Sequence, residues 1–440
     1  MGSLLLVLLL GPVWAWSQTP MEGEFQVNEA TGGFQRQSDV AKAPDGSFVV
    51  VWSDYGSSPG LRGVTPHQID ARRFGSDGTP LTGALQIDQG TTVELDYDPR
   101  IDSDVGGNFV VVWTKRRDFR RGGNTSVIYH RLVDSTGSPV GSQFQVSTSI
   151  DYYRDWNAGV SKDARGNFVV VWQGFYYSLY GGGRWKIFRR RFSSDGAPLE
   201  NQFLVRHQSQ GPFGNLRDPA VSHNSSSGEF VVVWARYTFY YSWAISGRRY
   251  DSMGSPIGAE FQVNTSTPLH FSSPDISHDS EGNFVVAWDD YYPCGAGPPR
   301  NIFARRFNSA GNPLGDQFQV NQYTVGSRRS PRISHDPSGG FVVAWQSDPQ
   351  DGSGYGVFAR LFDSSGSAQG AEFQVNQYTT SFQGLPALSH DSSGGFVLSW
   401  ESYGQDGSDY GVFARGTSAP IVTSGPAAGG ASLVRRHQRG

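Results

Sequence analysis

Cysteine is nearly absent from this chain, because Cys294 is the only one among 440 residues. A single thiol excludes an intramolecular disulfide, and no cysteine lies near the N-terminus to receive a lipid. The nine histidines include no His-x-x-x-His pair, so the sequence indicates no zinc site. We expect neither cross-links nor a cofactor to hold the fold together.

Charge and long apolar runs are also scarce. Charged residues make up 17% of the chain and the formal net charge is −4, which gives no general attraction to nucleic acid or anionic membranes. The apolar run Leu4–Leu10 is shorter than the roughly 20 residues that span a bilayer. Together with the small-x-small site Ala15-Trp16-Ser17, it predicts a secretory signal over residues 1–17. We therefore expect a secreted, extracellular protein with no nucleic-acid partner and no membrane span.

What the chain does contain is one short apolar strand in seven copies, each ending in tryptophan. The copies start 54 to 62 residues apart, a period typical of β-propellers and β-solenoids. Glycine is plentiful, at 56 residues, as expected where many strands are joined by tight turns. The copies, which define repeat units 1 to 7, are Phe48–Trp52, Phe109–Trp113, Phe168–Trp172, Phe230–Trp234, Phe284–Trp288, Phe341–Trp345 and Phe396–Trp400.

Each repeat unit reads as four antiparallel strands. The tryptophan strand is the second of the four. Its side chains are apolar at both odd and even positions, so both faces of the strand are predicted to be buried between neighbouring sheets. Turns of the Asp-x-x-Gly type, such as Asp363–Gly366, separate the third strand from the fourth. The sequence thus predicts an all-β fold built of four-stranded antiparallel blades.

The ends of the repeat predict how a ring would close. The fourth-strand motif Glu24-Phe25-Gln26-Val27-Asn28 precedes unit 1, and unit 7 ends after its third strand at Arg415. Pairing the first strand with unit 7 would complete a seven-bladed β-propeller and remove an exposed sheet edge. We expect the domains to be residues 18–416 for this propeller and 417–440 for a flexible tail rich in Gly, Ala and Ser.

These motifs resemble a repeat of secreted bacterial β-propeller proteins. The resemblance covers residues 24–416 and rests on Glu-Phe-Gln-Val-Asn, Phe-Val-Val-Val-Trp and Phe-Ala-Arg-Arg-Phe motifs such as those that begin at 372, 168 and 303. It implies a propeller and export, and it supplies no catalytic residues. The segments Ser277–Phe284 and Ser334–Phe341 also look like the Asp-box turn of sialidases, which in those enzymes lies away from the active site.

Features present in every unit are interpreted as structural. An arginine recurs at one register of the third strand, where it is expected to make an ion pair or to pack between blades. The Ser-His-Asp strings at Ser277, Ser334 and Ser389 cannot form a triad, because consecutive strand residues point to opposite faces. The arginines are Arg72, Arg131, Arg190, Arg248, Arg305, Arg360 and Arg415.

Two short loops carry oxygen-rich side chains. Asp351–Gly354 and Asp406–Asp409 have neither the number nor the spacing of ligands that a calcium loop needs. Calcium is left open as an alternative there, and no metal ligand is assigned.

One sector of the long-loop face is rich in aromatic residues, which commonly mark a recognition surface when exposed. Such rings stack on sugars while neighbouring polar groups bind hydroxyls; alternatively, they pack on one another and stiffen the loops. A basic run, Lys115–Arg121, is either a site for an anionic glycan or phosphate or an ordinary solvated loop. The ligand-binding candidates are Tyr152, Tyr153, Trp156, Tyr176, Tyr177, Trp185, Tyr237, Tyr240, Trp243, Tyr291 and Tyr292.

The leading hypothesis is a monomeric, non-catalytic binding module for a glycan or another cell-surface polymer. One alternative is a carbohydrate-active enzyme, either a hydrolase with paired carboxylates or a lyase that uses Tyr or His with Arg. Another is a structural or protein-interaction propeller with a protein partner. The catalytic candidates for the enzyme alternative are Asp96, Asp98, Asp155, Asp289, Asp290, Glu401, His67, His207 and His270.

Overall fold

The computed structural model describes residues 23–56, 67–90, 95–117, 125–148, 153–177, 183–207, 215–238, 242–265, 270–291 and 299–417. Within these residues the chain forms 28 strands and no helix. In the same ranges, no helix long and apolar enough to cross a membrane is found. The predicted all-β class is confirmed.

Every repeat unit contributes an inner, a second and a third strand, and an outer strand follows or, for unit 7, is supplied by the N-terminus. The inner strands are β2 (Gln35–Lys42), β6 (Leu95–Ser103), β10 (Tyr153–Lys162), β14 (Leu216–His223), β18 (His270–His278), β22 (Ser327–His335) and β26 (Gln383–His390). The second strands are β3 (Phe48–Asp54), β7 (Phe109–Arg117), β11 (Phe168–Tyr177), β15 (Phe230–Thr238), β19 (Phe284–Tyr291), β23 (Phe341–Asp348) and β27 (Phe396–Tyr403). The third strands are β4 (Gln68–Phe74), β8 (Thr125–Val133), β12 (Gly183–Phe192), β16 (Ser242–Tyr250), β20 (Ile302–Phe307), β24 (Gly356–Phe362) and β28 (Tyr410–Gly416). The outer strands are β5 (Leu85–Gln86), β9 (Pro139–Gln145), β13 (Phe203–His207), β17 (Pro256–Gln262), β21 (Phe318–Gln319), β25 (Phe373–Gln374) and β1 (Phe25–Gln26).

The strands pair in sequence order within each unit. Units 1, 4, 5 and 6 form four-stranded sheets, and β1 joins β28, β27 and β26 in a fifth. Units 2 and 3 form one eight-stranded sheet, because Arg154 of β10 makes a single parallel bridge to Ser126 of β8. The predicted four-stranded antiparallel arrangement is therefore present, with an added link between two neighbouring units.

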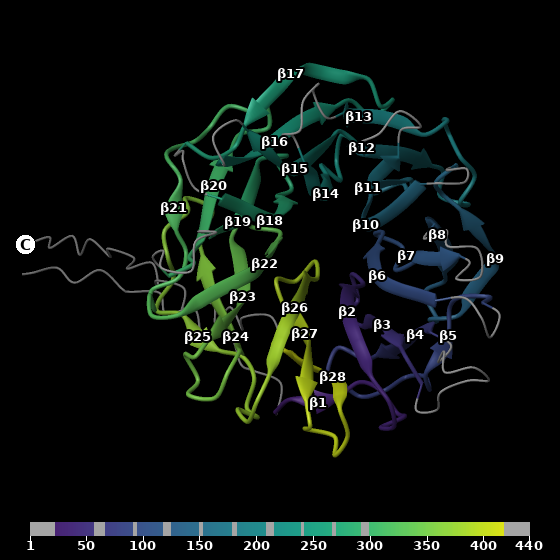
Figure 1. Ribbon diagram of the computed structural model, residues 1–440, viewed down its shortest axis with the longest axis vertical. Coiled ribbons are helices and arrows are strands. Elements are labelled where there is room, and N and C mark those ends of the chain that lie inside the picture. Colours follow the sequence, from purple (N-terminus) through teal and green to yellow (C-terminus); the bar gives the residue numbers. More distant parts are fainter. Residues whose placement is uncertain are drawn as a thin grey trace, which may run out of the picture.

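The sheets stand around a central axis with their first strands innermost (Figure 1). A channel of about 440 Å³ runs along this axis and is lined by residues of all the inner strands. Each inner strand packs beside the next one, and β26 packs beside β2. Radially repeated four-stranded sheets around a channel are the architecture of a β-propeller.

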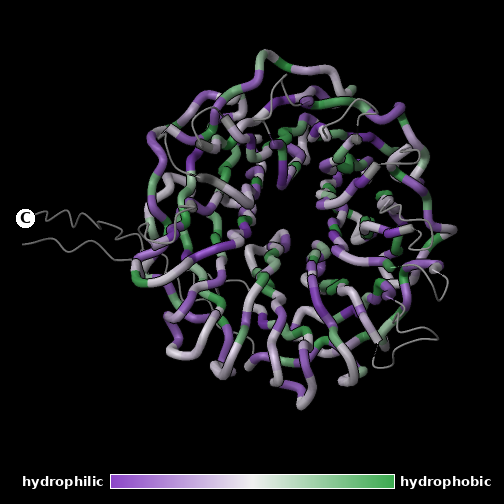
Figure 2. Tube along the Cα trace, viewed as in Figure 1, coloured by the Kyte–Doolittle hydropathy of each residue, from purple (hydrophilic) through white to green (hydrophobic). Residues whose placement is uncertain are grey.

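The tryptophan strands are buried because each lies between two sheets. Trp113 is fully buried, and it packs in one cluster with Val49 and Val51 of the preceding sheet. The same arrangement recurs between units 3 and 4, where Trp234 packs with Val169 and Val171. Hydrophobic segments accordingly gather within the wall of the ring, and hydrophilic ones are frequent at its outer turns (Figure 2).

The N-terminal strand makes the same contacts as the other outer strands. Phe25 pairs with Ala414 of β28, and Val27 is fully buried. The Asn28 side-chain oxygen accepts the Val412 N–H at 2.8 Å, just as the Asn376 oxygen accepts that of Val357 at 2.7 Å. The final asparagine of the motif thus fixes the outer strand to the third strand in units 4, 5, 6 and 7, and Asp88 and Ser147 accept the corresponding N–H in units 1 and 2.

The recurrent arginines join neighbouring units. For six of the seven, one guanidinium nitrogen donates to the carbonyl at the end of the preceding outer strand, at 2.7–3.0 Å. In unit 1 the bond runs from Arg72 to Val27 at 3.0 Å, so it connects this unit to the N-terminal strand. These contacts agree with the structural interpretation, with hydrogen bonds to carbonyls in place of most of the expected ion pairs.

Candidate binding pocket between units 2 and 3

A β-bulge interrupts each inner strand near the loop face. In every unit the bulge contains a non-glycine residue with φ between 50° and 57°, and these residues line the channel. They are Gln37, Asp98, Asn157, Asp218, Ser273, Ser330 and Leu385. The bulges decide which side chains face the channel and which face the neighbouring sheet.

Two of the catalytic candidates hold these bulges in place. Glu401 accepts the Gln37 N–H at 2.5 Å and pairs with Arg36 Nε at 3.0 Å. Asp289 accepts the Ser330 N–H at 3.1 Å and a bond from Ser272. Burial raises the pKa of Glu401 and raises that of Asp289 to about 6. Both carboxyl groups lie between sheets, where a substrate does not reach them.

The remaining carboxylate candidates are also held by protein groups. Asp96 is fully buried and 3.3 Å from Lys115 Nζ, and burial is the main reason that its pKa is raised to about 8. Asp155 is fully buried, and Asp290 accepts the Asn301 N–H. Asp98 pairs with Arg100 at 3.0 Å and lines the channel. Of the six carboxylate candidates, Asp98 is the one that lines the channel in the described structure, where Asp39 and Asp218, which were not candidates, also lie.

The histidine candidates do not come together either. The His67 ring packs against Tyr55 at an interplanar angle of 57° with centroids 4.1 Å apart, and burial lowers the pKa of His67 to about 4. His207 is exposed at the end of β13. His270 begins β18, and its side chain lies outside the description.

The Ser-His strings form a seam between inner strands. The hydroxyls of Ser277 and Ser334 accept the backbone N–H groups of His335 and His390 at 3.1 and 3.2 Å. In the turn that follows, Asp336 accepts the Ser338 and Gly340 N–H groups at 2.7 and 3.0 Å. Serine and aspartate therefore have structural partners, as the argument against a triad requires.

The histidine at the end of β14 gives a pH-dependent prediction. His223 is 9% exposed, and burial lowers its pKa to about 4 from 6.5. Because the folded-state pKa is depressed, the unfolded chain takes up the proton first, and stability is lost as pH falls from about 6.5 to about 4. We expect the wild type to lose about 3 kcal/mol more than His223→Gln over this interval, measured by urea unfolding. Equal losses in both proteins would show that His223 is protonated in the folded state.

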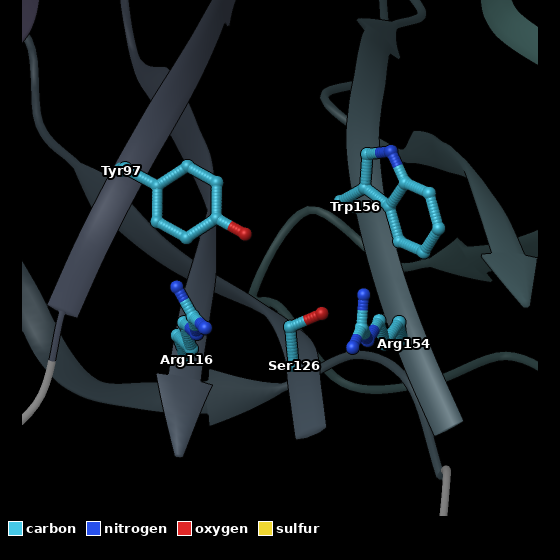
Figure 3. A pocket seen from close by; sticks show the side chains of 5 residues that line it. All are labelled: Tyr97, Arg116, Ser126, Arg154 and Trp156. Atoms are coloured by element: carbon cyan, nitrogen blue, oxygen red, sulfur yellow. The ribbon is translucent and has the colours of Figure 1, made fainter. Parts of the chain in front are cut away.

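A pocket of about 230 Å³ opens between units 2 and 3, and its lining is drawn in Figure 3. Tyr97 of β6 and Trp156 of β10 each immediately precede the bulge residue of their strand. Arg116 of β7, Ser126 of β8 and Arg154 of β10 complete the described lining. Two aromatic rings, two guanidinium groups and two hydroxyls thus converge on one hollow.

Strand register explains why these side chains share one face. Arg116 is paired with Ser126, and Ser126 is bridged to Arg154, so the three stand in one row across β7, β8 and β10. Paired residues of neighbouring strands point to the same face, as do residues two apart on one strand. Trp156 is two residues after Arg154, and Tyr97 is paired with Thr114, two residues before Arg116. The bridge between units 2 and 3 makes this face continuous.

Among the predicted ligand-binding residues, the described lining of this pocket contains Trp156, and Trp185 packs beside it. Trp156 lines it, and Trp185 packs edge-on against Trp156 with centroids 5.3 Å apart. Tyr176 lies 5.0 Å from Lys186 Nζ on the neighbouring strand. Part of the aromatic sector therefore packs on itself, which is the alternative considered for these rings.

Tyr237 and Trp243 form a separate pair in unit 4. Their centroids are 5.3 Å apart, and the Arg217 guanidinium lies 3.6 Å from the Trp243 ring. Trp243 is 4% exposed and belongs to the core between units 4 and 5. The expectation of an exposed ring is wrong for Trp243, because β16 begins at Ser242 and directs this side chain inward with Ile245.

The other predicted residues are only partly covered by the structure. Tyr153, Tyr177 and Tyr291 are terminal strand residues whose side chains lie outside the description. Tyr152, Tyr240 and Tyr292 lie outside the described residues altogether. Within the basic run, Lys115 is buried beside Asp96, and Arg116 enters the pocket.

Sequence reasoning missed Tyr97 and Ser126 and did not assign Arg116 and Arg154 to one site. Tyr97 was hidden between Asp96 and Asp98, which drew attention as carboxylates. Aligning the repeat units gives a signal for Tyr97. It stands directly before the bulge residue of its inner strand, as Trp156 does in unit 3, and units 1, 4 and 6 have Arg36, Arg217 and Arg329 at that position.

The calcium candidates are structural turns. Asp351 accepts a hydrogen bond from the Ser353 N–H at 3.1 Å. Asp406 accepts hydrogen bonds from the Ser408 N–H at 3.1 Å and from the Asn28 side-chain amide at 3.4 Å. Among the described residues, no group of three or more His, Cys, Asp or Glu side chains is arranged to hold a metal ion.

Comparison with known proteins shows the fold and nothing finer. No protein-family model and no curated protein sequence matches the chain. A Dyadobacter fermentans protein of unknown function is similar in structure, with TM-score 0.55, 11% identity, and coverage of 91% of this chain and 98% of that one. An ulvan lyase, described as a new family of polysaccharide lyase, is similar with TM-score 0.53, 11% identity, and coverage of 90% and 95%. The same enzyme bound to a GlcA(1-4)Rha3S unit gives TM-score 0.52 at 10% identity, with coverage of 90% and 95%.

Proposed function

We propose that this protein is a secreted, non-catalytic binding module for a glycan or another cell-surface polymer. The observation that carries the proposal is the pocket in which Tyr97 and Trp156 face a row of polar side chains (Figure 3). Aromatic faces stack on the apolar faces of sugar rings, and neighbouring hydrogen-bond donors bind their hydroxyls. The ulvan lyase that resembles this chain acts on a polysaccharide, which agrees with the proposal, although the likeness itself concerns the fold.

The architecture proposed with this function is a closed ring of seven blades. The pairing of β1 with β28 and the packing of β26 beside β2 support it. We further propose that residues 1–17 direct export, that 417–440 form a tail, that the protein acts as a monomer, and that it belongs with the secreted bacterial propellers its repeats resemble.

Binding without catalysis is favoured by what lines the pocket. No carboxylate is among its described lining residues, so a hydrolase with paired carboxylates finds no partners there. Burial and the neighbouring Asp98 carboxylate raise the pKa of Tyr97, which keeps its hydroxyl protonated at neutral pH. A protonated phenol donates hydrogen bonds well and is a poor general base.

A polysaccharide lyase is the second candidate, because a tyrosine hydroxyl and an arginine share this pocket. In that reaction a base removes the proton at C5 of a uronate. The C4–O bond then breaks, a C4=C5 double bond forms, and the departing oxygen takes a proton. The test is to incubate the protein with its ligand and to look for unsaturated sugar ends. If they form with the wild type and not with Tyr97→Phe, the protein is a lyase and the proposal of a non-catalytic module is wrong.

Trp156→Ala is expected to weaken glycan binding about ten-fold or more, because a stacking platform is removed from the pocket. Tyr355→Ala is the matched control, since Tyr355 is a partly buried ring near Arg329 in unit 6. A glycan array identifies the ligand, and calorimetry with that ligand measures the loss. Equal losses in both variants, or undiminished binding by Trp156→Ala, would refute the assignment of this pocket.

A further inference from the structure

The two pocket arginines come from different repeat units. Arg116 lies on the second strand of unit 2, and Arg154 lies on the inner strand of unit 3. Both flank Ser126 in strand register, one on each side. Figure 3 shows the three side chains in a row beneath Tyr97 and Trp156. The junction therefore places one positive charge on each side of the Ser126 hydroxyl.

The arginines act on the interior of the pocket. Both guanidinium groups favour the ionised form of Tyr97, although burial outweighs them and leaves the pKa of this hydroxyl raised. Tyr97 thus stays a donor, and Ser126 and both arginines are donors as well. The described lining therefore brings two guanidinium groups and two hydroxyls to one hollow, and such donors complement an anion.

The arginine pair is confined to this junction. Three residues after the strand tryptophan, where unit 2 has Arg116, the other units have Tyr55, Phe175, Tyr237, Tyr291, Asp348 and Tyr403. Three residues before the bulge residue, where unit 3 has Arg154, they have Phe34, Leu95, Asn215, His270, Ser327 and Phe382. A feature needed for folding would recur with the repeat, as the third-strand arginines do, and this one does not.

We infer that the pocket selects an acidic sugar residue, whose carboxylate or sulfate ester sits between Arg116 and Arg154 while its ring lies against Trp156. The inference rests on the proposed glycan-binding function and adds the chemical class of the ligand. Arginine suits this task because its planar donors engage the oxygens of a carboxylate or sulfate in pairs. The volume of about 230 Å³ is below the roughly 300–1,000 Å³ of sites that enclose drug-sized ligands, which suits a single sugar unit.

The test compares matched oligosaccharides and matched variants. The ligands are a uronate oligosaccharide and its carboxyl-reduced form, and a sulfated oligosaccharide and its desulfated form. The proteins are the wild type, Arg116→Gln/Arg154→Gln, and Arg329→Gln as a control arginine near the loop face of unit 6. Thermal melting of each variant checks that the fold is retained, and calorimetry at two salt concentrations measures affinity.

We expect the wild type to bind one acidic ligand about ten-fold or more tightly than its neutral form. The double variant should lose this preference, and Arg329→Gln should keep it. The pair of ligands that shows the preference identifies carboxylate or sulfate as the recognised group.

Equal binding of acidic and neutral forms, with Trp156→Ala still impaired, would overturn this inference and leave the proposed function intact. A preference that survives in the double variant, or one that Arg329→Gln also removes, would likewise overturn it, because the charge would not be read in this pocket. Absence of binding to every glycan would instead reject the proposed function.

Discussion

Deleting residues Glu24–Asn28 is expected to lower the free energy of unfolding by about 5 kcal/mol or more, or to prevent folding. The deletion removes the buried Val27 side chain and leaves β28 without the partner that it has in β1. It also removes Glu24, which accepts the Gln377 and Tyr378 N–H groups at 2.6 and 2.9 Å. Differential scanning calorimetry of the variant and the parent measures the loss.

The control is a variant that lacks residues 418–440, which is the predicted tail 417–440 without Thr417, and we expect its melting temperature to be close to that of the parent. The reason for expecting a large difference is that Glu24 reproduces an internal contact. Glu372 accepts the Gln322 and Tyr323 N–H groups at 2.6 and 2.8 Å in the same way. If both deletions left the melting temperature unchanged, β1 would not complete the last sheet in solution.

Lys42→Met is expected to cost about 3–5 kcal/mol, because it leaves the Asp391 carboxylate buried without its cation. Lys42 Nζ lies 2.6 Å from Asp391, and the two side chains are 2% and 5% exposed. Burial alone would raise the pKa of Asp391, but the hydrogen bond from Lys42 and its positive charge hold this pKa below its usual value. Since the pair joins unit 1 to unit 7, its loss also weakens the contact between these two units. Chemical denaturation measures the change.

Lys162→Met is the matched comparison, because the same pair recurs inside the ring. Lys162 Nζ lies 2.8 Å from Asp104, with side chains 2% and 8% exposed, and this pair joins units 2 and 3. In a closed ring the two substitutions cost similar amounts. A loss for Lys162→Met together with a negligible loss for Lys42→Met would indicate that units 1 and 7 are not in contact in solution.

The fold was predictable because the same apolar strand, which needs cover on both faces, occurs in all seven repeat units. An apolar strand without alternation, such as Phe341–Trp345, must be covered on both faces, and only stacked sheets achieve this. The position of each arginine on its third strand was likewise visible. Its partner was not, because the carbonyl that Arg360 reaches belongs to Val320, 40 residues earlier, and such contacts arise only when sheets are stacked.

The candidate site was predictable in part. The aromatic sector led to Trp156, and the basic run contained Arg116. The exposure of Trp243 was misjudged because its segment was taken as a loop. In the structure β15 ends at Thr238 and β16 begins at Ser242, so Trp243 is a strand residue whose side chain points to the buried face. The pocket itself depends on the bridge between Arg154 and Ser126, which no local pattern encodes.

A crystal structure of the protein with a bound acidic oligosaccharide tests the account most directly. The account predicts a carboxylate or sulfate oxygen within hydrogen-bond distance of both Arg116 and Arg154, with the sugar ring against Trp156. An oligosaccharide bound in the central channel or on another unit, with this pocket empty, would contradict it.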